Sequence, residues 1–348
     1  MMPSSLDAHL GSYAGADPLR SKVAETIRHL ASAAVKLRNT IIDGGTSDHL
    51  GQSRQVANAG GDIQKELDVV ADRLFFDAAK ASSVAFYGSE EQDLPVVLSK
   101  DGAFALAIDP LDGSSNIEMN VSVGTIFSLL PVEEAHRTDP ASAFRQPGSK
   151  QIAAGFFVYG PQLQLVLSLG NGTHVFAFSP SFGGFVELHA SMAVDEKAKE
   201  FAINASNHRH WDEAMRIYID DLLAGADGPR ERDFNMRWIA SLVADCYRIL
   251  IRGGIFLYPG DGRQGYAKGR LRLVYEANPI AFCVEHAGGS ATDGITRILD
   301  LVPEDLHART PLVFGSKREV ARVTRYLTDP SAIGERSPLF GKRSLFRA

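Results

Sequence analysis

The residues best suited to chemistry lie where a short apolar run ends in two aspartates, Asp109 and Asp112. Carboxylate oxygens are the ligands that hard divalent cations prefer. The next three residues offer N–H and O–H groups that can hold phosphate oxygens: Gly113, Ser114 and Ser115. Because proline fixes φ and glycine permits positive φ, the chain is expected to turn directly after the apolar run. An isolated Asp-x-x-Asp-Gly segment is more often a solvated turn, so the metal interpretation depends on acids elsewhere.

Further acids follow other apolar runs that are short enough to be buried strands. Glu90 and Glu91 follow the run 84–87, and Glu276 follows the run 271–275 and stands shortly before a proline. Open α/β sheets bind their ligands beyond the carboxyl ends of the strands. Acids at three strand ends therefore predict a shared multi-metal centre.

A helix is predicted to begin at Asp62, because apolar residues recur on one face of the segment that follows. Asp62 and Asp68 are six residues apart, about 600° of rotation in a regular helix, so they do not share a side. Asp62 could serve a site only from its junction with the preceding loop, 44–61, which is expected to be mobile. Asp72 is expected on the solvated face of the helix.

Four segments are expected along the chain. Residues 1–17 lack a basic start and an apolar middle, which predicts a disordered lead-in and not a signal peptide. A metal- and phosphate-binding α+β domain is predicted over 18–197, with a long amphipathic helix first and an antiparallel meander later. Strands and helices alternate over 198–330, which predicts an α/β substrate domain. Residues 331–348 are expected to be a polar tail.

The composition is ordinary for a globular protein with more than one core. The chain has 348 residues, of which 45% are hydrophobic and 22% charged. A formal net charge of −6 argues against nucleic-acid or acidic-membrane binding, and no apolar run approaches membrane-spanning length. The two cysteines, Cys246 and Cys283, lack metal-type spacing and indicate a reducing, cytoplasmic setting.

Taken together, these motifs resemble those of class 1 fructose-1,6-bisphosphatases, in the superfamily of Mg-dependent, lithium-sensitive sugar and inositol phosphatases. The resemblance covers about residues 20–328. The pattern Asp-Pro-(Ile/Leu)-Asp-Gly-(Ser/Thr) alone specifies only the superfamily. The bisphosphatases are indicated by Asp-Pro-Leu-Asp-Gly-Ser-Ser-Asn (109–116), Gly-Thr-Ile-Phe (124–127), Gly-Gly-Ile-Phe-Leu-Tyr-Pro (253–259) and Leu-Arg-Leu-Val-Tyr-Glu-Ala-Asn-Pro (271–279). It implies a sugar-phosphatase fold of the α/β class with stacked α-β-α-β-α layers.

The resemblance also implies a role for each site residue. Two or three Mg²⁺, or Mn²⁺ in their place, would be held by Glu90, Asp109, the Leu111 carbonyl, Asp112 and Glu276. Asp68 and Glu91 would take a proton from the attacking water, with Asp62 near the third cation. The phosphate that is cleaved would be held by Gly113, Ser114 and Ser115.

A second set of residues would hold the remote 6-phosphate: Asn204, Asn207, Tyr258 and Arg270. Arg237 matches an arginine that reaches into the neighbouring subunit's site, which implies a homo-oligomer, usually a homotetramer. In AMP-inhibited relatives a Lys-Tyr pair and an arginine bind the nucleotide. Here Ala103, Phe104 and Pro131 stand at those positions, so AMP inhibition of the usual kind is not expected.

The expected activity is hydrolysis of fructose 1,6-bisphosphate to fructose 6-phosphate and phosphate, in gluconeogenesis or the Calvin cycle. Sedoheptulose 1,7-bisphosphate is an alternative or second substrate. An inositol-type monophosphatase is disfavoured, because it would not need Asn204, Arg237 and Arg270. An inactive phosphate-binding scaffold is also disfavoured, because every expected carboxylate ligand is present. Trp238 replaces a usual tyrosine near the 6-phosphate, and Arg270 replaces a lysine.

Overall fold

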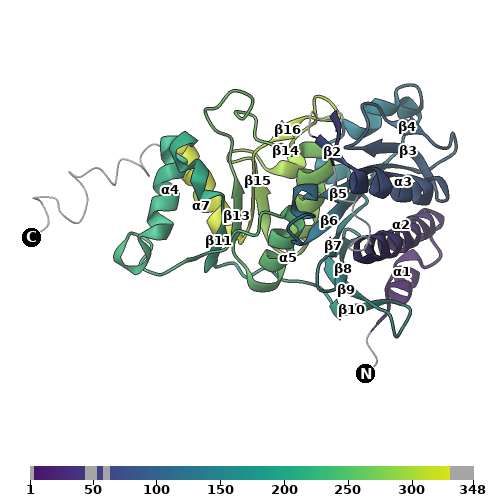
Figure 1. Cartoon of the computed structure of the whole chain (residues 1–348), viewed down its shortest axis with the longest axis horizontal. Coiled ribbons are helices and arrows are strands. Elements are labelled where there is room, and N and C mark those ends of the chain that lie inside the picture. Colours follow the sequence, from purple (N-terminus) through teal and green to yellow (C-terminus); the bar gives the residue numbers. More distant parts are fainter. Residues whose placement is uncertain (1–3, 44–52, 58–62, 330–348) are drawn as a thin grey trace, which may run out of the picture.

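The N-terminal helices form the first layer of the molecule. The computed structural model describes residues 4–43, 53–57 and 63–329, and Figure 1 shows helices α1 (Leu6–Ala14), α2 (Pro18–Asp43) and α3 (Glu66–Lys80) together on one side. The predicted long helix is α2, whose first turn is capped by Asp17: its carboxylate accepts the N–H groups of Leu19 and Arg20.

The prediction that residues 1–17 form a disordered lead-in is wrong for Leu6–Ala14, which form α1. The Ser5 side chain accepts the N–H of Ala8 at the N-terminus of this helix, and Leu6 and Leu10 are buried in the core below it. Burial of two leucines and a capped N-terminus stabilise a helix too short to persist alone. The abundance of small residues concealed this apolar pair.

Helix α3 begins at Glu66, four residues later than predicted. Residues Ile63–Lys65 form strand β2 instead, which pairs with β1 (Ser53–Ala57). Of the predicted loop 44–61, only these five residues of β1 are described, and they are extended. Asp62 lies outside the described residues.

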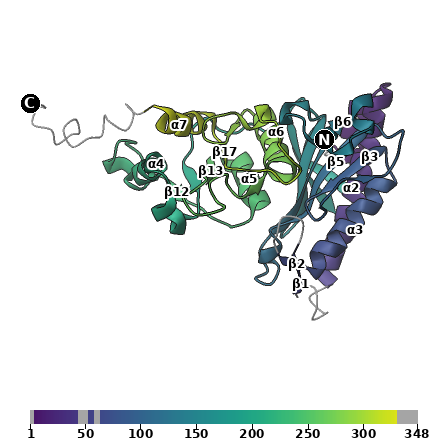
Figure 2. The same cartoon turned by 90° about the horizontal axis from the view of Figure 1, so that it is seen from above.

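The second layer is an eight-stranded sheet of order β10-β9-β8-β7-β6-β5-β3-β4, covered on one face by the N-terminal helices (Figures 1 and 2). Only β3 and β5 are parallel, and the remaining neighbours are antiparallel. The predicted meander forms three of these strands, with a fourth beyond it. The bounds are β3 Val84–Ser89, β4 Val96–Val97, β5 Phe104–Asp112, β6 Val123–Pro131, β7 Ala153–Tyr159, β8 Leu163–Ser168, β9 Thr173–Ser179 and β10 Gly184–His189.

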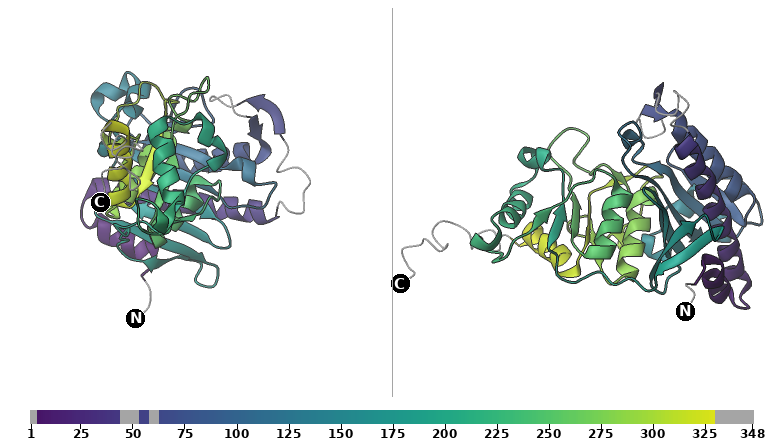
Figure 3. Two further views of the ribbon diagram at one scale, coloured as in Figure 1. Left: turned by 90° about the vertical axis from the view of Figure 1, so that its left-hand side faces the viewer. Right: turned by 60° about the horizontal axis from the view of Figure 1, so that its bottom comes forward.

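The third layer consists of two helices between the sheets, α5 (Leu242–Arg252) and α6 (Asn278–His286), seen in green in the right-hand view of Figure 3. Their buried residues share one hydrophobic cluster with residues from both sheets, such as Phe156 on β7 and Phe314. The two halves of the chain therefore pack through a continuous apolar core.

The fourth and fifth layers are a five-stranded sheet of order β12-β11-β13-β17-β15 and two outer helices. The elements are β11 Glu200–Ala202, β12 Asn235–Met236, β13 Ile255–Tyr258, β15 Ser290–Thr292, β17 Leu312–Gly315, α4 Glu213–Leu223 and α7 Lys317–Thr328. A separate two-stranded pair joins β14 (Leu271–Arg272) to β16 (Arg309–Thr310). The stacked α-β-α-β-α layers confirm the predicted fold class.

Within the described residues, no helix has both the length and the apolar character needed to cross a bilayer. The first large sheet ends at His189 and the second begins at Glu200. We therefore propose a domain boundary in the charged segment 194–200, as the sequence suggested.

Candidate active site

Strand β5 continues further than the sequence indicates. Instead of turning after Ile108, it runs on through Pro110, with an irregular register against β6 where Asp109 faces Ile126 and Asp112 faces Gly124. A bulge of this kind accommodates proline, because one residue is released from the hydrogen-bond ladder. The chain turns only at Gly113, whose φ of 77° favours glycine. The two aspartates are thereby held in fixed backbone rather than in a solvated turn.

Asp109, Asp112 and Glu276 form a buried carboxylate cluster. One oxygen from each lies within 4.8 Å of the others, and all three side chains are buried. Burial, and then neighbouring carboxylates, raise the pKa of Asp109 and of Glu276 well above the usual range, and burial raises the pKa of Asp112 to about 7. Three carboxyls resist ionisation here unless a cation joins them.

Glu90 adds a fourth carboxylate to this cluster. Its charge raises the pKa of Asp109, Asp112 and Glu276, and the buried guanidinium of Arg272 forms an ion pair with it at 3.2 Å. The backbone N–H of Arg272 also donates to Glu276. Arg272 therefore balances part of the negative charge of the cluster.

The sequence predicted that Glu276 lies at the end of a strand, and this prediction is wrong. Strand β14 ends at Arg272, and the apolar residues Leu273–Ala277 form a π-helical turn that leads into α6. The apolar run could not distinguish a buried strand from a buried helical turn, because both are uniformly hydrophobic. The wider π turn is frequent at functional sites and here carries Glu276 to the cluster.

A separate polar pocket of about 120 Å³ lies in the second half of the chain. The pocket is lined by all four residues that were predicted to hold the remote phosphate, namely Asn204, Asn207, Tyr258 and Arg270. Arg263 completes the lining with a guanidinium that donates to the Asn207 side chain at 3.1 Å. The Asp261 carboxylate, also in the lining, pairs with Arg263, which leaves Arg270 and the two amides as the groups best suited to an anion.

The pocket and the carboxylate cluster are joined by a few consecutive residues. Arg270 lines the pocket, and Arg272, two residues later on β14, contacts both Glu90 and Glu276. Groups of both sites act on the pKa of Tyr258: burial raises this pKa, Arg270 of the pocket lowers it, and Glu276 of the cluster raises it. A ligand with two anionic groups could therefore contact both sites.

The chain matches family models along nearly its whole length. Residues 15–190 match "Fructose-1-6-bisphosphatase, N-terminal domain", and residues 194–328 match the C-terminal domain of the same family. This chain belongs to the fructose-1,6-bisphosphatase family. The membership confirms the predicted resemblance, with its class of phosphoric monoester hydrolase.

Named relatives within the fructose-1,6-bisphosphatase family agree with this assignment. The class 1 fructose-1,6-bisphosphatase of Rhizobium meliloti is 59% identical over 100% of both chains, and that of Azorhizobium caulinodans is 55% identical over 94% of this chain and 100% of the relative. The crystal structure of Leishmania major fructose-1,6-bisphosphatase in holo form has a TM-score of 0.87 at 32% identity, covering 94% of this chain and 99% of that one. The same enzyme in its T-state gives 0.83 at 30% identity.

In this fructose-1,6-bisphosphatase chain, the N-terminus of α5 is part of the site, which the sequence did not predict. Asn116 donates its side-chain N–H to the Ala240 carbonyl at 2.8 Å, and the N–H of Val243 donates to Asp112 at 3.2 Å. Among the residues that the structure describes, the buried hydroxyl of Ser241 has no hydrogen-bond partner, and it lies 3.9 Å from the position of a Cβ built on Gly113. A buried hydroxyl without a partner marks Ser241 as a further candidate ligand contact.

The acids of α3 differ from expectation in one respect. Asp68 is buried in the first helical turn, and Glu91 follows β3 and is partly buried. Asp72, expected to face solvent, instead accepts hydrogen bonds from Tyr87, Ser89 and the side chain of Gln92 at 2.6–2.9 Å. Asp72 therefore fixes the end of β3, directly before the acids that follow it.

Arg237 and Trp238 lie outside the described pocket lining. The Arg237 guanidinium is about half exposed and lies 3.6 Å from Glu200, which also pairs with Arg248 and Arg252. Trp238 stacks on Phe256. Neither residue contributes to the pocket walls of the single chain.

The place of Arg263 in the pocket lining was not predicted, because the loop that carries it has no recognisable pattern.

Proposed function

We propose that the protein hydrolyses the 1-phosphate of fructose 1,6-bisphosphate with the help of Mg²⁺. The observation that carries the proposal is the buried cluster of Asp109, Asp112 and Glu276 beside a Gly-Ser-Ser turn, with an arginine-lined pocket at the other end of β14. This arrangement offers cation ligands and two separate sites for anions. Membership of the family supports the same substrate.

The donor set of the cluster fits Mg²⁺. All of its side chains offer hard oxygen ligands, and the raised pKa values of Asp109, Asp112 and Glu276 indicate that these carboxyls need a cation in order to ionise together. We propose two to three Mg²⁺ per subunit, with Mn²⁺ as a substitute, held by Glu90, Asp109, the Leu111 carbonyl, Asp112 and Glu276. When bound, these ions supply charge neutralisation for the transferring phosphoryl group and acidify bound water.

The remaining chemistry is assigned to residues of this chain. Gly113, Ser114 and Ser115 would hold the phosphate through N–H and O–H groups, together with the N-terminus of α5. Asp68 and Glu91 would accept the proton of the attacking water. We propose that Asp62, at its junction with the loop 44–61, lies beside the third cation.

The 6-phosphate is assigned to the pocket, with Asn204, Asn207, Tyr258 and Arg270 as its ligands. Arg263 joins this set on the strength of its position in the pocket wall. Binding energy from this distant group would hold the sugar so that the 1-phosphate meets the carboxylate cluster in a fixed orientation.

The assembly is proposed to be a homotetramer in the cytoplasm, active in gluconeogenesis or the Calvin cycle. The partly exposed guanidinium of Arg237 is free to extend beyond its own subunit, which supports a shared site. Its pairing with Glu200 would then be exchanged for a contact with the neighbouring subunit's substrate.

The decisive experiment measures phosphate release from fructose 1,6-bisphosphate, sedoheptulose 1,7-bisphosphate and inositol 1-phosphate, with Mg²⁺ and with chelator. The proposal requires Mg²⁺-dependent release from the first substrate. Comparable release from the second would establish dual specificity, since one extra carbon could fit the loop-lined pocket. Release from inositol 1-phosphate alone would overturn the assignment.

A further inference from the structure

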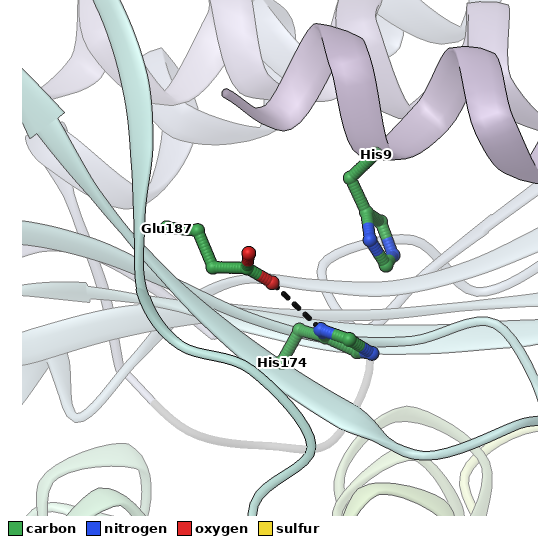
Figure 4. Close-up of side chains that lie close together, drawn as sticks. All are labelled: His9, His174 and Glu187. Atoms are coloured by element: carbon green, nitrogen blue, oxygen red, sulfur yellow. Dashed lines mark hydrogen bonds and ion pairs between the residues drawn. The ribbon is translucent and has the colours of Figure 1, made fainter. Parts of the chain in front are cut away.

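A second cluster of potential metal ligands lies far from β14, at the sheet edge covered by α1. It consists of His9 on α1, His174 on β9 and Glu187 on β10, which converge in Figure 4. Nitrogen and oxygen atoms of the three side chains lie within 4.8 Å of one another, and His174 Nδ1 is 2.8 Å from the Glu187 carboxylate. All three are partly buried. The hydrolysis described above uses none of them.

The backbone holds α1 in place above the two strands. The N–H of Glu187 donates to the carbonyl of Ser4 at 2.8 Å, and Ser5 forms a β-bridge with Val186. Within α1, Leu6 and Leu10 are buried in the core, which fixes the rotation of the helix. His9 is therefore directed toward the sheet by the neighbours that flank it.

The strand register places the other two ligands on the same face. Glu187 pairs with Phe176, and His174 precedes Phe176 by two residues, so their side chains share a side of the sheet. The ring of His9 lies 4.3 Å from that of His174 and 5.4 Å from that of Phe176, measured between centroids. Three elements thus present their donors to one point.

We propose that His9, His174 and Glu187 form a site for a borderline transition-metal cation of the Zn²⁺ type. Two imidazoles and one carboxylate are a donor set that Zn²⁺ binds well and that Mg²⁺, which prefers oxygen alone, does not. In tetrahedral zinc sites the ligand atoms are about 3.3 Å apart, so small side-chain rotations suffice here. The partial exposure leaves room for water as a fourth ligand.

The charge and protonation of the cluster agree with this assignment. Burial, and then the proximity of His174, lower the pKa of His9, whereas the charge of Glu187 raises it; an imidazole donates its lone pair to a metal only in the neutral form. Glu187 supplies the negative charge for a divalent ion. The metal would replace the hydrogen bond between His174 and Glu187 and would tie α1 to the edge of the eight-stranded sheet.

The test uses the full-length protein without a histidine tag. Bound Zn²⁺ is counted by equilibrium dialysis in excess Mg²⁺, so that the carboxylate cluster is already filled. The variants are His9→Ala and Glu187→Gln, and the matched control is His189→Ala, which removes an exposed histidine near the end of β10. Circular dichroism checks that each variant is folded.

The proposal predicts that the wild-type chain and the control each bind one Zn²⁺. Both ligand variants should lose this ion or bind it at least about tenfold more weakly, because even the hydrogen-bond partners of metal ligands contribute about 10–100-fold to affinity. Hydrogen exchange in α1 should slow on Zn²⁺ addition in the wild type and in the control, and not in the two ligand variants. Equal Zn²⁺ binding by wild type and both variants, or no Zn²⁺ bound in excess Mg²⁺, would overturn it.

Discussion

The Asp112 carboxylate accepts a hydrogen bond from the backbone N–H of Val243 at 3.2 Å, although 131 positions separate the two residues. Val243 lies in the first turn of α5, where N–H groups have no partner within the helix and the dipole is positive. The end of β5 is thereby tied to a helix of the second half. Two distant stretches of sequence meet at the carboxylate cluster.

Asp112→Asn should abolish Mg²⁺-dependent phosphate release while leaving the fold intact. The amide keeps an oxygen that can accept the Val243 N–H, but it removes the negative charge that a cation needs. Loss of several kcal/mol of charge stabilisation corresponds to about 10³-fold in kcat. Steady-state kinetics with a thermal melt would check this. Retained turnover in a folded variant would remove Asp112 from the ligand set.

Stability should depend on pH in opposite ways with and without Mg²⁺. The pKa of Asp112 is raised to about 7 in the folded protein, against about 3.9 for an unfolded aspartate. Between these values the folded state holds the extra proton, so the metal-free protein loses stability as pH rises toward about 7. The ionised carboxylate binds Mg²⁺, so the Mg²⁺-induced rise in Tm should grow over that window. Calorimetry in EDTA and in Mg²⁺ measures both trends, and Asp112→Asn should weaken them.

Arg270→Ala should raise KM for fructose 1,6-bisphosphate by about 10–100-fold, because it removes a charged hydrogen-bond donor from the pocket. Arg263→Ala should have an effect of the same kind. Lys268→Ala serves as the control, because its ammonium pairs with Glu304 on the surface. A substrate with a single phosphate should be hydrolysed equally by all three variants. An equal loss on both substrates would contradict the pocket assignment.

Subunit mixing can test the role of Arg237. Arg237→Ala alone should bind substrate poorly, and Asp112→Asn alone should be inactive. When the two are co-expressed, a subunit with an intact carboxylate cluster can receive Arg237 from its neighbour, so activity should recover to a fraction of wild type. Arg252→Ala, which loses the same Glu200 partner, is the control and should retain full substrate affinity. Absence of recovery in mixed oligomers would exclude a shared site.

AMP should leave the activity unchanged. Phe104 is completely buried, and it pairs across the sheet with Pro131, the position where AMP-inhibited relatives carry an arginine. This part of β5 and β6 therefore offers apolar core in place of nucleotide ligands. Initial rates with millimolar AMP provide the measurement, and inhibition at that concentration would show that another surface binds the nucleotide.

The sequence predicted those elements that are specified by residues close together in the chain. The apolar period of α2, the acids after β3 and the acids in the last residues of β5 are local signals, and all of these elements appear in the structure. The contact between Asn116 and Ala240 was not predictable in this way, because the two residues are 124 positions apart. Tertiary packing alone brings such partners together.

Local patterns failed where one composition suits two structures. The apolar run before Glu276 was compatible with a strand or a buried helical turn, and in the structure it forms a π turn that continues into α6. Asp72 was predicted to be solvated, because helix periodicity does not show which residues of other elements pack against a given position. Three hydrogen bonds from β3 and the segment after it decide its role.

The short strand β14 also links the two candidate sites. Arg270, directly before the strand, lines the pocket, and the N–H of Arg272 at its end donates to Glu276 of the carboxylate cluster. We therefore propose that this stretch of backbone limits the spacing between the two phosphates of a substrate. One inserted residue would move Arg270 relative to the cluster, so the preferred substrate would change even if the volume of the pocket did not.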